Sequence, residues 1–123
     1  MKHLILIFAA SLVLSACEKT NDQPLIKGKL VHRSCASVVV QVLDSTKYFI
    51  AQNTWQQDSS KPVYEHVFAV SNQCSFPGSV TVGQEFNFKV VDEDPMQKEC
   101  VLCALFDNPP KKTNMIKVPG GED

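Results

Sequence analysis

The stretch Glu85–Asp92, EFNFKVVD, decides the fold class of this 123-residue chain. Its apolar residues Phe86, Phe88 and Val90 alternate with polar ones, so an extended chain places all three on one face. The preceding VGQ contains Gly83, a residue type that favours turns. The stretch is therefore predicted to be a β-strand with one face against a core and the other toward solvent.

Several other stretches have the composition of β-strands. They are LIKGKLVH (25–32), SVVVQVL (37–43), YEHVFAV (64–70), CVLCALF (100–106) and a shorter edge strand, NMIKV (114–118). The valine-rich run is apolar at nearly every position, so we expect it to be buried on both faces. The intervening stretches 44–62, 72–79 and 92–98 are polar or contain proline and glycine, and are predicted to be loops or turns. We find no amphipathic helix of normal length, so the chain is predicted to be all-β.

The order of these strands resembles the OB-fold, a small Greek-key barrel. The resemblance spans residues 25–107 and is carried by a glycine in the first strand, a short first turn and the VGQEFNFKVVD fourth strand. It implies a barrel of five to six strands. The helix that OB-folds usually have between their third and fourth strands would be missing or reduced to a turn around SNQCSFPGS (71–79). An immunoglobulin-like sandwich is the alternative, although it normally needs seven strands.

The N-terminal segment has the features of a lipoprotein signal peptide. Lys2 and His3 precede an apolar run, Leu4–Leu14, that is shorter than the roughly 20 residues needed to span a bilayer as a helix. The LSAC that follows (14–17) resembles the bacterial lipobox, which implies cleavage before Cys17 and lipidation of its thiol.

This organisation predicts four segments. They are a signal peptide (1–16), a lipidated N-terminus and flexible tether (17–24), a single β-barrel domain (25–118) and a disordered tail (119–123).

The residues after Cys17 indicate where the anchored protein resides. Glu18 occupies the position at which Asp favours retention in the inner membrane, so we expect a lipid anchor in the outer membrane. EKTND (18–22) resembles a surface-export signal of Bacteroidota lipoproteins, which leaves the periplasmic face and the cell surface both open.

A wider set of motifs resembles small cysteine-containing Bacteroidota-type lipoproteins of unknown function. These motifs are LSAC, GKLVHRSCASVVVQVL (28–43), FAVSNQCSFP (68–77) and CVLC (100–103). The resemblance implies a fold and a compartment, and it implies no activity.

The cysteines other than Cys17 are predicted to form two disulfides. They are Cys35, Cys74, Cys100 and Cys103, and an even count in a small exported domain is typical of disulfide bonding. If CVLCALF is a strand, the Cα atoms of residues 100 and 103 lie roughly 10 Å apart, beyond the about 7 Å that a disulfide tolerates. We therefore expect the two earlier cysteines each to bond one of the two later ones, and which pairs with which stays open. A redox-active CxxC and a four-cysteine zinc site are the alternatives, but neither the helix nor the second CxxC that they require is present.

Two aromatic residues in the polar stretch 44–62, Trp55 and Tyr48, are candidate ligand-binding residues. An exposed indole flanked by polar residues can stack on a sugar ring or anchor a protein partner. The alternative is that Trp55 folds back and covers one end of the barrel. Tyr48 and its neighbour Phe49 have the same two interpretations.

Other residues give weaker signals for chemistry. His32 and His66 have no sequence neighbour that would orient them for catalysis or metal binding. The acidic cluster 92–94 is interrupted by Pro95, so it is expected to be a solvated turn. We predict no catalytic residue, no metal site and no cofactor. The net charge of −1 predicts no general affinity for nucleic acid.

These observations lead to three functional hypotheses. The first is a non-enzymatic, lipid-anchored domain of the cell envelope that binds a protein or a glycan through its loops. The second is an inhibitor of an enzyme that attacks the envelope. The third is a thiol oxidoreductase that uses Cys100 and Cys103. The oligomeric state stays open.

Overall fold

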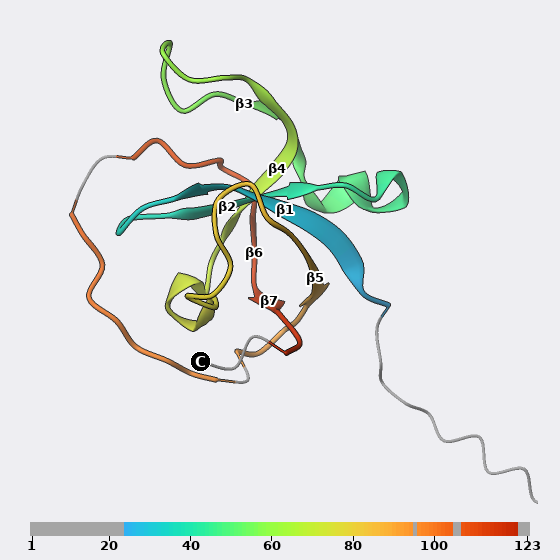
Figure 1. Cartoon of the computed structure of the whole chain (residues 1–123), viewed down its shortest axis with the longest axis vertical. Helices are drawn as coiled ribbons and strands as arrows, with labels where there is room; N and C mark the ends of the chain where they lie inside the picture. The colour runs from blue at the N-terminus through green and yellow to red at the C-terminus, as the bar shows by residue number, and fades with distance from the viewer. Residues whose placement is uncertain (1–23, 95, 105–106, 121–123) are drawn as a thin grey trace, which may run out of the picture.

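The computed structural model describes residues 24–94, 96–104 and 107–120 and shows an all-β domain (Figure 1). The strands are β1 (Ile26–Arg33), β2 (Val38–Val42), β3 (Gln52–Trp55), β4 (Tyr64–Val70), β5 (Glu85–Val90), β6 (Thr113–Asn114) and β7 (Ile116–Lys117). The helical elements of this part of the chain are two short 3₁₀-helices, η1 (Ser45–Ile50) and η2 (Gln73–Ser75). The predicted all-β class is confirmed.

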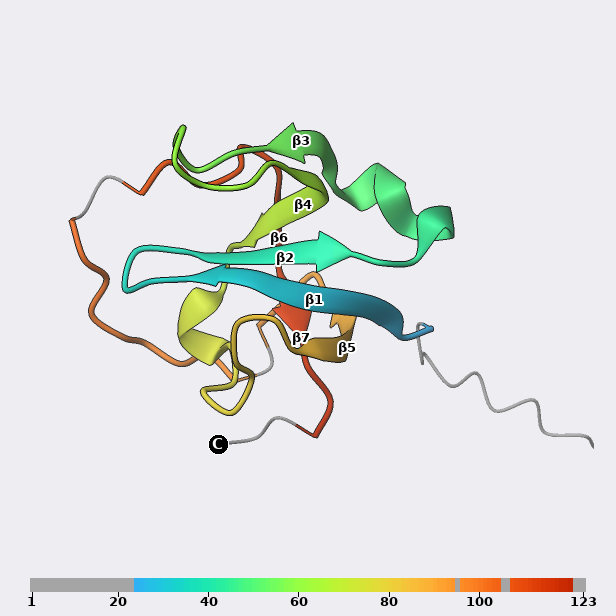
Figure 2. The same ribbon diagram turned by 45° about the horizontal axis from the view of Figure 1, so that its top comes forward.

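The strands form one curled sheet, seen with β1 and β2 in front in Figure 2. Antiparallel pairs join β1 to β2 and to β5, β2 to β4, and β4 to β3. The C-terminal strands link the two sides of the sheet, because β6 pairs in parallel with β4 and β7 pairs antiparallel with β5. Only Met115 separates β6 from β7. The path β1-β2-β4-β6/β7-β5 therefore returns to β1, which is consistent with a small OB-like barrel. A single curled sheet favours this barrel over the immunoglobulin-like sandwich, which packs two separate sheets.

Four of the predicted strands are present as β1, β2, β4 and β5, and the predicted edge strand is present as β6 and β7. Between β4 and β5 the chain forms only η2, so the helix typical of OB-folds is reduced to a 3₁₀ turn, as expected.

Two predictions about local structure are wrong. Residues 100–104 form no strand, because the two cysteines there are bonded to a hairpin turn and to η2 and the chain between them meets no sheet edge. The stretch 44–62 is not all loop, since it contains η1 and β3. Only Trp55 is buried in β3, so this strand has no alternation of apolar residues by which the sequence could reveal it.

The sheet has apolar residues on both of its faces. The main core lies inside the curl and includes Leu30, Phe68 and Phe88, each 0% exposed. Gly28 lets this core close, because a Cβ there would lie 2.8 Å from Cε1 of Phe88. A smaller cluster lies on the outer face and consists of Val31, Val39, Trp55 and Val67, with Tyr64 packed against it.

The valine-rich strand β2 contributes to both clusters. Val38, Val40 and Val42 belong to the main core, and Val39 belongs to the outer cluster. The prediction that this strand is buried on both sides is confirmed.

Candidate functional site

The outer cluster is shaped by a β-bulge in β1. Leu30 pairs with Val40 and His32 pairs with Val39, so Val31 has no partner residue in β2. A bulge changes the direction in which the following side chains point. As a result, both Val31 and His32 line a groove on the outer face, although neighbours on a regular strand point to opposite faces.

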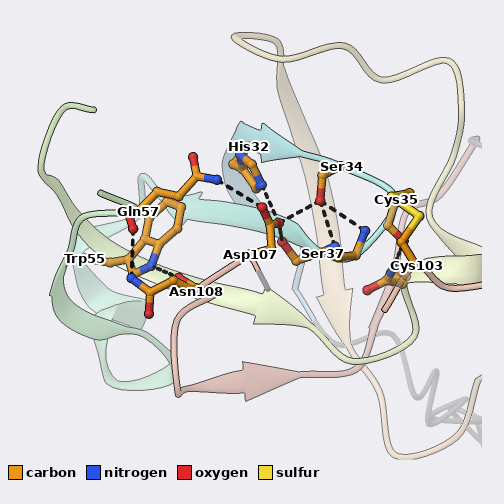
Figure 3. Close-up of polar contacts among 11 residues, drawn as sticks. His32, Ser34, Cys35, Ser37, Trp55, Gln57, Cys103, Asp107 and Asn108 are labelled. Carbon is orange, nitrogen blue, oxygen red and sulfur yellow. Dashed lines mark hydrogen bonds and ion pairs between the residues drawn. A yellow bond between two sulfur atoms is a disulfide. The ribbon is translucent and has the colours of Figure 1, made fainter. Parts of the chain in front are cut away.

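Asp107 is the polar centre next to this groove (Figure 3). Its Oδ2 accepts hydrogen bonds from His32 Nε2 at 2.8 Å, from Ser34 Oγ at 2.6 Å and from Ser37 Oγ. Its Oδ1 accepts a hydrogen bond from Gln57 Nε2 at 3.0 Å. The carboxylate therefore joins the β1–β2 hairpin to the chain that follows β3.

The surroundings of Asp107 keep it ionised. Burial raises the pKa of its carboxyl, but the hydrogen bonds from Ser34, Ser37 and His32 outweigh this effect and lower the pKa from 3.8 to about 2. A carboxylate only accepts hydrogen bonds, so the Nε2 of His32 carries the hydrogen that lies between the two groups.

The hydrogen bonds around Asp107 run in a different order from those of a catalytic triad. In a triad the serine hydroxyl donates to the histidine, which in turn donates to the aspartate. Here Ser34 and Ser37 donate directly to Asp107, as does His32. The arrangement holds a hairpin turn in place and does not activate either serine as a nucleophile.

Trp55 is buried and is not an exposed loop residue. It is 7% exposed, and its Nε1 donates to the carbonyl oxygen of Asn108 at 2.8 Å. Its ring stacks beside Tyr64, with centroids 6.2 Å apart, and meets His32 edge-on at 6.0 Å. Of the two interpretations of Trp55, the structure supports the one in which the ring folds back onto the barrel and not the one in which the indole is exposed. The ring covers the outer face of the sheet, however, and not one end of the barrel.

The groove has a volume of about 340 Å³. Its lining residues come from β1, the loop between β3 and β4, the ends of these two strands, and the turn before β5. They are Val31, His32, Arg33, Trp55, Gln57, Lys61, Pro62, Tyr64 and Val82. The lining therefore combines aromatic rings with basic side chains and contains no aspartate or glutamate.

Arg33 is fixed at the rim of the groove. Its Nη1 donates to the carbonyl oxygens of Pro77 at 2.8 Å and Val80 at 3.2 Å, and its guanidinium lies 5.3 Å from the ring centre of Phe76. Lys61, in contrast, is an exposed residue.

The other candidate, Tyr48, is not among the residues that line this groove. It belongs to η1, packs against the main core and stacks on His66 with centroids 3.5 Å apart. Its neighbour Phe49 is 73% exposed. His66 has a φ of 56° and a buried Nδ1 without a hydrogen-bond partner in the described part of the chain. The structure therefore does not bring the two predicted ligand-binding residues into one site.

The four cysteines form two disulfides, Cys35–Cys103 and Cys74–Cys100, each with Cα atoms 5.4 Å apart. The expectation that each earlier cysteine bonds a later one is confirmed, and the connectivity is now known. Cys100 and Cys103 are not bonded to each other, unlike the cysteines of an oxidised redox-active CxxC. Two disulfides indicate an oxidising, extracytoplasmic environment. The lipidation site predicted at Cys17 lies outside the described residues.

The described residues contain no cluster of three or more histidine, cysteine or acidic residues placed to hold a metal ion. They also contain no helix long and apolar enough to cross a membrane.

In the acidic turn, Asp94 accepts a hydrogen bond from Ser75 Oγ at 2.5 Å, which lowers the pKa of Asp94.

In comparisons with known proteins, no family model, curated protein or solved structure gives a significant match to this chain.

The sequence did not reveal the hydrogen-bonded cluster around Asp107. Asp107 and its serine donors are separated by 70 or more residues, and the tetrapeptide HRSC gives no sign that a distant carboxylate binds it.

Proposed function

We propose that this chain is a lipid-anchored domain of the bacterial cell envelope that binds an acidic glycan in the groove beside Trp55 and Tyr64. The observation that carries the proposal is the composition of the groove. Its walls are aromatic, its polar groups are Gln57 and basic side chains, and its lining contains no acidic residue.

The size of the groove favours a small ligand over a protein partner. A volume of about 340 Å³ is at the lower end of the range for small-molecule sites. A stable protein interface instead needs about 800 Å² of surface from each partner. One or a few sugar units match the groove better than a protein does.

The polar groups of the groove favour a carboxylated sugar. Sugars bind through the apolar faces of their rings and through hydrogen bonds from their hydroxyl groups. Tyr64, half-buried at the start of β4, supplies an aromatic surface, and Gln57 supplies an amide. Lys61 adds a cation that a carboxylate would pair with.

The fixed parts of the groove favour binding without a large conformational change. Trp55 and Arg33 are both held by backbone carbonyl groups, and Gln57 is bonded to Asp107. A pre-organised site loses little entropy when its ligand binds.

The lipid anchor is proposed from LSAC (14–17) and supported by the disulfides, which are typical of exported proteins. We place the anchor at Cys17 and in the outer membrane, because Glu18 follows the cysteine. Cells given an alkyne-tagged palmitate should label the natural chain and should not label the Cys17→Ser variant. Equal labelling of both would contradict the anchor.

The groove is tested by calorimetric titration of the Cys17→Ser chain with an oligogalacturonate. The methyl ester of the same oligosaccharide is the uncharged comparison. We expect the acidic form to bind and the ester to bind at least about fivefold more weakly, because the ester cannot pair with a cation.

Two variants locate the binding site. Lys61→Gln should weaken binding of the acidic oligosaccharide and leave binding of its ester unchanged. Tyr64→Ala should weaken binding of both. Lys111→Gln is the matched control, because Lys111 is exposed and does not line the groove. Binding that is lost equally in Lys61→Gln and Lys111→Gln would contradict the proposed site, and no binding of either oligosaccharide would contradict the glycan proposal.

A further inference from the structure

Residues 97–104 form an exposed segment that is fastened to the barrel at two points. All of them are exposed and none belongs to a helix or strand. Both ribbon views show the segment, in orange, as an arc along the outside of the molecule (Figures 1 and 2). Cys100 is bonded to Cys74 in η2, and Cys103 is bonded to Cys35 in the β1–β2 turn. We call the tetrapeptide between these two anchor points, Cys100–Cys103, the clamped loop.

The clamped loop presents two apolar side chains to solvent. Val101 is 96% exposed and Leu102 is 52% exposed. Single exposed apolar residues are common on protein surfaces, but these two are adjacent and held between disulfides. Valine is also stiff about its χ1 angle, so it loses little freedom when a pocket encloses it.

We propose that the clamped loop docks in the active-site cleft of a serine protease whose specificity pocket accepts small aliphatic side chains, with Val101 in that pocket. Such proteases recognise an exposed chain through a pocket that selects one side chain, and elastase has a small pocket of this kind. None of residues 97–104 lines the groove described above, so this function would use a separate surface.

The two disulfides favour inhibition over digestion. In the first step, the protease serine Oγ bonds to the carbonyl carbon of Val101 and the Val101–Leu102 bond breaks. The nitrogen of Leu102 takes the proton that the serine gave to the protease histidine. Cys100 and Cys103 remain bonded to Cys74 and Cys35, so both new ends stay attached to the barrel. The Leu102 amine is therefore retained near the acyl carbon and can re-form the peptide bond before water completes the hydrolysis.

The same clamps lower the cost of binding. A flexible peptide loses conformational entropy when it is ordered in a cleft, and a loop held at both ends loses less. The backbone N–H of Cys103 also donates to the carbonyl oxygen of Cys35 at 3.3 Å. The loop should therefore bind more tightly than a linear peptide of the same sequence.

The test measures inhibition of pancreatic elastase and of trypsin by the purified Cys17→Ser chain. We expect inhibition of elastase and none of trypsin, whose pocket requires a basic side chain. Val101→Lys should reverse this preference, with the inhibition constant for elastase raised at least about 100-fold. Val63→Lys is the matched control, because Val63 is also an exposed valine, at 59%, but lies in a different loop.

A second measurement follows the bond itself. After incubation with elastase, any cleaved chain should stay in one piece without reductant and give two fragments with it. The proposal is overturned if the chain does not inhibit elastase. It is also overturned if Val63→Lys changes the specificity as Val101→Lys does, or if elastase cuts the loop as fast as the linear peptide ECVLCA.

Discussion

The carboxylate of Asp107 takes part in hydrogen bonds with residues of β1, of the β1–β2 turn and of the loop after β3. Asp107 is 8% exposed, so removing its charge would leave several of these donors without a strong acceptor. The residue joins parts of the chain that share no strand pairing with it. It should therefore affect stability more than an exposed aspartate does.

The stabilising effect of Asp107 should depend on pH. Its folded pKa of about 2 lies below the ordinary value of 3.8, so its contribution is complete above about pH 4 and is lost as the pH falls through about 2. The shift corresponds to about 2 kcal/mol in the free energy of unfolding at neutral pH. We expect Asp107→Asn to be less stable by about this amount at neutral pH, and the difference from the natural chain to shrink toward about pH 2.

Urea denaturation across this pH range measures the effect. Asp92→Asn is the control, because Asp92 is exposed in the acidic turn. A difference between Asp107→Asn and the natural chain that stays constant with pH would contradict the prediction.

At the scale of elements, the barrel depends on the short strand β7, whose two residues offer few backbone hydrogen bonds to its neighbours. The side chain of Asn72 adds hydrogen bonds to this strand. The Nδ2 of Asn72 donates to the carbonyl oxygen of Ile116 at 2.8 Å, and its Oδ1 accepts from the N–H of Ile116 at 3.0 Å. Asn72 thus takes the place of a neighbouring strand for Ile116, which is 4% exposed.

Asn72→Ala should lower the free energy of unfolding by roughly 2–3 kcal/mol, because it leaves two backbone groups of a buried residue without partners. Asn72→Asp should lose the donor and keep the acceptor, so its effect should be smaller at neutral pH. Chemical denaturation measures both, and Asn53→Ala at an exposed position of β3 is the control. Equal stabilities of Asn72→Ala and the control would show that Asn72 does not support β7.

For the whole molecule, the disulfides restrict the unfolded chain. They join residues separated by 68 positions (Cys35–Cys103) and by 26 positions (Cys74–Cys100). Loop-closure entropy predicts that replacing both cysteines of a pair by serine costs about 4.4 kcal/mol for the longer loop and about 3.5 kcal/mol for the shorter one. Urea midpoints of the two double variants should therefore rank in this order, with the Cys35/Cys103 variant less stable. The opposite ranking would mean that native contacts, and not loop length, determine the stabilisation.

The larger part of the fold could be predicted from local patterns. The alternation in EFNFKVVD and the continuous apolar run in SVVVQVL are properties of consecutive residues, and β5 and β2 lie there. β3 could not be predicted in this way, because most of its residues are exposed. The stretch CVLC was wrongly predicted to be a strand because its residues are apolar. Its valine and leucine are exposed, and its cysteines are bonded to Cys74 and Cys35 outside any strand.

By itself, the sequence determined the all-β class, the positions of four main strands and the grouping of four cysteines into two disulfides, because each depends on residue type and short-range spacing. Only the tertiary structure decided which cysteines pair, that Trp55 is buried, and that His32 and Asp107 meet beside a groove. These contacts join residues far apart in the chain. The position of His32 beside the groove follows from the bulge at Val31 and the curl of the sheet, which no local pattern encodes.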